Sequence, residues 1–290
     1  MAAAFGAALL DAVRKDMIQC KFVGVALGDP LISFTDTVLS YGPYLFSLSL
    51  MDEKALNKTL QLATETAKAA DKGDYHKAMH LNDQGTILIR NATDNVDVYF
   101  VLRHNVPDSL KLPTIYVNAS RLSHHQMFVQ YLTISHSDPL FKLMNGPIRK
   151  KLGIIPDYVT WGGQSDIVLK SQYYDVPSSV ISDVSKLIRA GLKVVVYEGQ
   201  LDMICGVLGA EQWINKLSWD DLPQFLNSSR KPLYAPSKLE KKETGAFLKS
   251  YKNFELYYIL SAGHMVPIDA PEMALEMLKN LLKVTEAVDI

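Results

Sequence analysis

Residues 192–205 read LKVVVYEGQLDMIC, an apolar run that passes into a short polar loop. A run of this length that is apolar on both faces is typical of a buried strand in a parallel sheet. Asp202 follows the run. Open α/β sheets place their functional side chains on such loops, beyond the carboxyl ends of the strands. The stretch therefore predicts an α/β fold with a functional acid at one edge of the sheet.

A second stretch has the same form. Residues 253–271 read NFELYYILSAGHMVPIDAP, and His264 follows the apolar run as Asp202 follows the first one. Because the carboxyl ends of parallel strands meet at one edge, we expect the two side chains to lie close together. Such an acid holds a histidine ring in one tautomer and stabilises it when it takes a proton. The alternative is that Asp202 is a solvated turn residue and His264 has no role, but the glycines beside both favour sharp functional loops.

The other hydrophobic patterns fit the same fold class. Residues 2–17 form an Ala-rich amphipathic pattern typical of a helix, and residues 21–30, KFVGVALGDP, indicate a further buried strand. Apolar residues at helical spacing predict helices within 178–190, 208–217 and 271–288. This gives about three parallel strands, and no strand is predicted in the polar, proline-containing stretch that runs to about residue 245.

Polarity and hydrophobic pattern divide the chain into three parts. From about residue 36 to 180 the sequence is more polar and rich in helical patterns, as expected of a lid inserted into a sheet domain. We therefore predict core of the sheet domain in residues 1–35, a mostly helical cap or insertion in 36–178, and core carrying Asp202 and His264 in 179–290.

Composition argues against several classes of protein. The formal net charge is −1 with no long basic or acidic run, which argues against a nucleic-acid binder. No apolar run reaches the roughly 18 residues of a membrane span. The opening MAAAFGAALLDAVRK lacks a basic start, and Asp11 and Arg14 interrupt it, so we predict a helix there and no signal peptide.

Cysteines and sequons bear on the cellular compartment. The two cysteines, Cys20 and Cys205, cannot form a disulfide scaffold. N-x-[ST] sequons favour a protein of the secretory pathway and occur at Asn57, Asn91, Asn118 and Asn227. His76 and His80 share a helix face, but the glutamate of a zinc H-E-x-x-H motif is missing, so no metal site is predicted.

The two loop stretches resemble the C-terminal signatures of the serine carboxypeptidases, the carboxypeptidase Y-like peptidases. The most specific part is GHMVP, residues 263–267. The retinoid-inducible branch is especially similar in FVGVALGDPLISFTDTVLSYGPYLFSLSLM (22–51), and in LMNGPIRKKLGIIP and WGGQS (143–156 and 161–165). The resemblance covers essentially the whole chain. It implies an α/β-hydrolase fold with a helical cap, peptide or protein C-termini as substrate, no cofactor, and a secreted, lysosomal or vacuolar location.

The resemblance also implies roles for single residues. Asp202 matches the acid of a Ser-His-Asp triad, and His264 matches its general base and acid. Cys205 and Met265 match positions that line the substrate site in some members of the family. For Cys205, a small buried apolar residue is an equally good interpretation.

One part of the family pattern is absent. The family nucleophile lies in an E-S-Y-G-G elbow; no G-x-S-x-G occurs here, and Ser40 and Ser165 fall in the predicted cap or its entrance. MAAAFGAALLDAV resembles the helix behind the elbow, so we expect the chain to begin just after the serine, with an incomplete sheet and no hydrolysis by itself. Two alternatives are a non-catalytic member that binds peptides or a partner, and an acyltransferase, since an acyl-enzyme can pass to water or to an alcohol.

Overall fold

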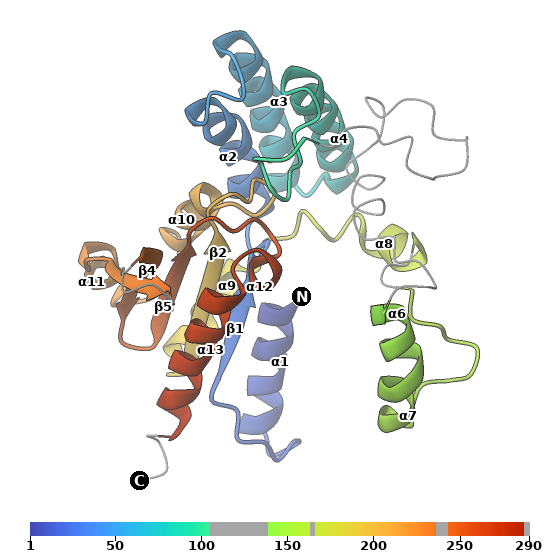
Figure 1. Cartoon of the computed structure of the whole chain (residues 1–290), viewed down its shortest axis with the longest axis vertical. Helices are drawn as coiled ribbons and strands as arrows, with labels where there is room; N and C mark the ends of the chain where they lie inside the picture. Colours follow the sequence, from blue (N-terminus) through green and yellow to red (C-terminus); the bar gives the residue numbers. More distant parts are fainter. Residues whose placement is uncertain (105–138, 163–165, 236–242, 287–290) are drawn as a thin grey trace.

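The computed structural model describes residues 1–104, 139–162, 166–235 and 243–286, and within them the strands form one mixed sheet (Figure 1). The strand order is β1-β2-β5-β4-β3. The first three strands in this order run parallel, and the last two pair antiparallel. Their bounds are Gly24–Gly28 for β1, Lys193–Gly199 for β2, Lys231–Ala235 for β3, Glu243–Tyr251 for β4 and Phe254–Ile259 for β5.

The three predicted parallel strands are confirmed, but the prediction that no strand lies in the stretch up to about residue 245 is wrong. β3 falls inside that stretch, and β4 begins at its end. β4 pairs with β5 from Ala246↔Ile259 to Tyr251↔Phe254. Antiparallel strands near a sheet edge keep one face toward water, so they lack the continuous apolar run of a buried parallel strand. Pro232 is tolerated because β3 is the terminal strand of the described sheet.

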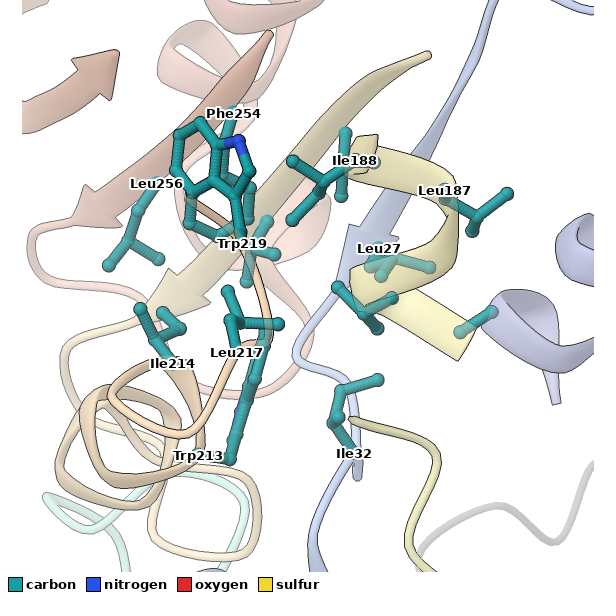
Figure 2. Packing of buried hydrophobic residues seen from close by; sticks show 14 of the residues in the cluster. Leu27, Ile32, Leu187, Ile188, Trp213, Ile214, Leu217, Trp219, Phe254 and Leu256 are labelled. Atoms are coloured by element: carbon teal, nitrogen blue, oxygen red, sulfur yellow. The ribbon is translucent and has the colours of Figure 1, made fainter. Parts of the chain in front are cut away.

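Helices cover both faces of the sheet. Because successive strand residues point to opposite faces, Val194 and Val196 face one core while Val195 faces the other. The first core, shown in Figure 2, joins the sheet to α1, α9, α10 and α11. The second joins it to α12 and α13. The bounds are Ala2–Arg14 for α1, Ile181–Arg189 for α9, Val207–Ile214 for α10, Leu222–Asn227 for α11, Val266–Asp269 for α12 and Pro271–Glu286 for α13.

A helical region lies at one end of the sheet, where α2, α3 and α4 stack together (Figure 1). These helices span Phe34–Ser47, Glu53–Asp71 and Tyr75–Ala92. Each begins at an N-cap residue whose side chain accepts a backbone N–H of the first turn; these N-caps are Ser33, Asp52 and Asp74. Their apolar side chains form a separate core with Met203 and Ile204, so the loop after β2 is anchored in the helical region.

Further short helices follow in the described part of the predicted cap. They are α6 (Pro139–Leu143), the π-helical η2 (Met144–Ile148), α7 (Arg149–Leu152) and α8 (Asp166–Gln172). The helix-rich character predicted for this region matches these elements, while the boundaries at residues 35 and 178 stay predictions. Among the described helices, none combines the length and the apolar character that crossing a bilayer requires.

Candidate active site

Asp202 lies in a tight loop at the carboxyl end of β2 and is completely buried. Its Oδ1 accepts the backbone N–H of Ile204 at 2.9 Å and that of Cys205 at 3.4 Å. The loop backbone is fixed in turn, because the N–H groups of Met203 and Ile204 both donate to the Val98 carbonyl. These bonds leave Oδ2 free to face the neighbouring loop.

His264 meets that oxygen from the loop after β5. Its Nδ1 lies 2.8 Å from Asp202 Oδ2, so the predicted acid–histidine pair is formed. The acid side chain is fully buried whereas 26% of the histidine side chain is exposed. The ring of Tyr99 packs edge-on against the imidazole, with centroids 5.3 Å apart. Within the described residues the opposite ring nitrogen, Nε2, makes no hydrogen bond.

Glycines allow the two loops to approach this closely. A Cβ on Gly199 would lie 2.2 Å from the Gly263 carbonyl oxygen, and one on Gly263 would lie 2.2 Å from that of Tyr99. The contacting atoms are backbone atoms, which cannot move aside as a flexible side chain could. The backbone N–H of Leu201 donates to the Ala262 carbonyl at 2.7 Å and joins the loops directly. The glycines noted in the sequence are thus required by close backbone contact.

At the Asp202–His264 pair, burial and the partner's charge shift each pKa in opposite directions. Burial raises the pKa of Asp202 above its ordinary value, and the hydrogen bond and positive charge of His264 oppose this rise. For His264, burial alone would lower the pKa. The hydrogen bond to Asp202 and the negative charge of Asp202, with a further contribution from Asp29, raise the pKa of His264 above its ordinary value. The acid therefore strengthens the histidine as a base.

Asp29 is a third member of the site, and the sequence analysis gave it no functional role. It follows β1 directly, at the same sheet edge, and its backbone has φ +40°. Its N–H donates to the Tyr197 carbonyl at 2.8 Å, and its Oδ1 accepts the N–H of Gly199 at 2.7 Å. The available signal was its position, since it ends the third parallel strand as Asp202 and His264 end the other two.

One group of described residues has the composition of a metal site, namely Asp29, Asp202 and His264, with potential ligand atoms within 4.8 Å of one another. Asp202 Oδ2 and His264 Nδ1 are already engaged with each other, and Asp29 Oδ1 accepts a backbone N–H. We therefore assign the group as a hydrogen-bonded acid–base cluster. His76 stacks on Tyr174 with centroids 3.6 Å apart, and His80 contacts Gln84, so neither faces this site.

Cys205 and Met265 lie beside the pair, as the sequence placed them. Cys205 is partly exposed as a residue, and its N–H points to Asp202. Desolvation, followed by the negative charges of Asp202, Glu198 and Asp29, raises the pKa of its thiol well above the ordinary value. Met265 is partly exposed and immediately precedes α12. Their contact with a substrate stays a prediction.

The two cysteines should differ sharply in reactivity. We expect iodoacetamide at pH 7.5 to modify the exposed Cys20 rapidly and Cys205 slowly, because the reactive thiolate is scarce at Cys205. Mass spectrometry of tryptic peptides over time measures both rates. A Cys20→Ser chain should then be almost unreactive until denatured. Equal rates at both sites would contradict the assigned environment of Cys205.

The other residues singled out in the sequence lie away from the histidine or outside the described residues. Ser40 is buried in α2, and its hydroxyl donates to the Thr37 carbonyl at 2.7 Å. Ser165 lies outside the described residues, as does the sequon asparagine Asn118. The remaining sequon asparagines are exposed and therefore accessible, namely Asn57, Asn91 and Asn227.

Comparisons with known proteins agree with this geometry. The serine carboxypeptidase family, peptidase S10, matches residues 1–284. The human retinoid-inducible serine carboxypeptidase is 44% identical over 96% of this chain and 61% of its own length. The mouse protein of that name is 42% identical over 98% and 62%, and Arabidopsis thaliana serine carboxypeptidase-like 51 is 35% identical over 98% and 62%. The chain thus spans about three fifths of these relatives.

A solved structure supports the fold. The crystal structure of Kex1Δp, a prohormone-processing carboxypeptidase from Saccharomyces cerevisiae, aligns with a TM-score of 0.63. The alignment covers 94% of this chain and 57% of the other, at 16% sequence identity. The fold is that of an α/β-hydrolase, of which the described sheet is a part. The family match over 1–284, on a chain that pairs Asp202 with His264, shows that this protein belongs to the serine carboxypeptidase family.

Proposed function

We propose that this chain provides the acid and the base of a serine-type carboxypeptidase, which hydrolyses the C-terminal residue from peptides. The observation that carries the proposal is the 2.8 Å contact between buried Asp202 and partly exposed His264. The pair lies beyond the carboxyl ends of parallel strands in a chain of this family. Peptide or protein C-termini are then the substrate class.

Each residue has one task in this mechanism. Asp202 Oδ2 accepts a hydrogen bond from Nδ1–H of His264, which leaves Nε2 with its lone pair available as the base. Nε2 would remove the proton of a serine hydroxyl as it attacks the scissile carbonyl, and would then give that proton to the leaving amine. The charge of Asp202 stabilises the imidazolium formed between these two steps. The loop contacts hold the imidazole ring and the carboxylate in place during the transfer.

The part of the chain that the structure describes places no nucleophile against His264. Within the described residues no serine hydroxyl is hydrogen-bonded to His264, and Ser40 is committed to a helix carbonyl. No G-x-S-x-G elbow occurs in residues 1–290. We therefore infer that residues 1–290 alone do not hydrolyse peptides, and that activity needs a serine from outside them.

Two assays on the purified chain test this inference. We expect no labelling by a serine-directed fluorophosphonate and no release of the C-terminal residue from blocked dipeptides between pH 4 and 8. An active family carboxypeptidase in the same assays serves as the positive control. Labelling of any serine that is lost in a His264→Gln variant would contradict the inference and would locate the nucleophile.

A second candidate is a non-catalytic member that binds peptides or a partner. The observation in its favour is the same Nε2, because a ring nitrogen on a side chain that is 26% exposed can donate to or accept from a ligand. Binding of a blocked peptide with a free C-terminal carboxylate, measured by calorimetry and lost in His264→Ala, would favour it. Absence of binding by 1–290, with hydrolysis by a longer form, would favour the enzyme.

The exposed sequons extend the proposal to the cellular location. We propose that the protein enters the secretory pathway and reaches the cell exterior, a lysosome or a vacuole, carrying glycans at accessible sequons. Asn57, Asn91 and Asn227 all present exposed side chains in the fold.

A further inference from the structure

Glu198 is a fully buried carboxyl group that the proposed mechanism does not use. It precedes the last residue of β2, opposite Tyr258 of β5, and is 0% exposed. By strand alternation its side chain lies on the face of Val194 and Val196, toward the first core. Neither of its carboxyl oxygens has a hydrogen-bond partner. A charged carboxylate in this position would be strongly unfavourable.

Asp29 is bonded to the backbone of β2 on both sides of Glu198. Its N–H binds the carbonyl of Tyr197 and its Oδ1 accepts the N–H of Gly199, so it bridges the residues on either side of Glu198. Asp29 is only 6% exposed, and its left-handed backbone brings the side chain back over β2. Asp202, four residues after Glu198, is also buried. Three buried carboxyl groups, those of Asp29, Glu198 and Asp202, thus lie at the carboxyl end of β2, and ligand atoms of Asp29 and Asp202 lie within 4.8 Å of His264.

The groups around this cluster give it little positive charge. From the loop after β2, the thiol of Cys205 stays protonated. From β5, the Tyr258 hydroxyl donates to Glu211 of α10, and Arg230 lies over the Tyr258 ring, 5.2 Å from its centroid. From α2, the Tyr41 hydroxyl donates to the Ile204 carbonyl.

Two other charged residues, Lys216 and Asp269, form their contacts with groups outside the carboxyl cluster. Lys216 pairs with Asp36 at 2.7 Å, and Asp269 accepts the N–H of Gly263 at 3.0 Å. His264 is therefore the one described group that can form a cation in hydrogen-bond contact with the cluster, and its contact is with Asp202. Only one of the three carboxyl groups has a cationic partner.

We propose that Glu198 and Asp29 are positioning residues that stay protonated as a neutral pair of carboxylic acids, which leaves Asp202 as the single carboxylate facing His264. The proton occupancy is a property of the fold, whereas its catalytic consequence rests on the proposed function. Two ionised neighbours would repel the charge of Asp202 and hold the His264 proton too tightly. The neutral pair preserves both the loop geometry and the basicity of the histidine.

The pKa shifts of both groups have the direction that the proposal requires. Burial, then the charge of Asp29, then that of Asp202, raises the pKa of Glu198 well above its ordinary value. Burial and the charge of Asp202 raise the pKa of Asp29 to about 8. In the unfolded chain both groups lose their protons near pH 4. Folding therefore takes up protons at these two groups, and their contribution to stability falls as the pH rises from about 4 to about 8.

The experiment compares the 290-residue chain with Glu198→Gln, which replaces the acid by a neutral group of similar shape. Infrared difference spectra at pH 6.5 should show the carbonyl stretch of an un-ionised carboxylic acid in the wild type, and a reduced band in the variant. Urea unfolding at pH 5, 6.5 and 8 gives the second reading. Each proton that the fold retains raises the unfolding constant by up to about tenfold per pH unit, and Glu198→Gln removes one such factor.

A third reading separates a charge role from simple packing. The imidazole signal of His264, followed by NMR, should show an additional alkaline inflection from the titration of Asp29, and this inflection should disappear in Asp29→Asn. Glu272→Gln on the exposed face of α13 is the matched control and should change none of the three readings. Asp29→Asn should also reduce the carboxylic acid band, because it removes the second member.

The outcomes are decisive in both directions. A band that persists unchanged in both Glu198→Gln and Asp29→Asn would overturn the proposal, as would an unfolding constant with the same pH dependence as the wild type. None of the readings requires hydrolysis. A failed carboxypeptidase assay therefore leaves this inference standing, and a lost infrared band supports it without supporting catalysis.

Discussion

Replacing Asp202 by asparagine should lower the pKa of His264 below its wild-type value. Burial already acts to lower it, and the Asp202 hydrogen bond and charge are the main influences that raise it. The variant loses that charge while keeping a side chain of similar size. NMR titration of the imidazole in residues 1–290, assigned with a His264→Gln chain, measures the change.

The same substitution should be severe in any longer form that contains the serine and hydrolyses peptides. Loss of the orienting acid leaves the histidine in the wrong tautomer, which costs about 10⁴-fold in kcat in serine proteases. Asp269→Asn is the control, since Asp269 ends α12, just after the His264 loop, and accepts the N–H of Gly263 rather than contacting the imidazole. An unchanged His264 titration in Asp202→Asn, or an equal shift in Asp269→Asn, would contradict the assigned pair.

Gly199→Ala should have the largest effect on stability. The added Cβ would lie 2.2 Å from the Gly263 carbonyl oxygen and 2.7 Å from that of Ala262, both backbone atoms of the histidine loop. Relief requires the two loops to separate, and we expect a loss of about 3 kcal/mol or more in the free energy of unfolding. Urea denaturation followed by circular dichroism measures it.

Gly85→Ala is the matched control for that change. Gly85 lies inside α4, where an added Cβ has no heavy atom within 4 Å. Alanine there should stabilise the chain by up to about 1 kcal/mol, through its better helix propensity. If Gly199→Ala proved as stable as the wild type while Gly85→Ala behaved as expected, the close approach of the two loops would be wrong.

Local sequence patterns were sufficient for much of the fold. The apolar runs before Asp202 and His264 became β2 and β5, and the runs at residues 21–30 and 271–288 became β1 and α13. These elements are buried on a regular face or on both faces, so their periodicity is written in the sequence. β3 and β4 were missed because both strands are only half buried, so pairing with their neighbours determines them more than their own residues do.

Some residues of the candidate site could be found from the sequence and others could not. Asp202 and His264 could be found because each follows a strong strand pattern and is flanked by glycine. Asp29 follows a similar strand, yet its role depends on the N–H of Gly199, 170 positions away. Glu198 gave no signal, since a glutamate near a strand end is ordinarily solvated and only the covering core buries it.

By itself the sequence determined the fold class, the family resemblance and the two residues of the acid–histidine pair, because each depends on short runs with their own periodicity or motif. Only the tertiary structure decided that Asp202 is fully buried 2.8 Å from His264, and that Asp29 and Glu198 share its environment. Those facts depend on which strands are neighbours and on what covers their ends. Proton affinity follows from that burial, so the chemistry of the site was settled by packing between segments far apart in the chain.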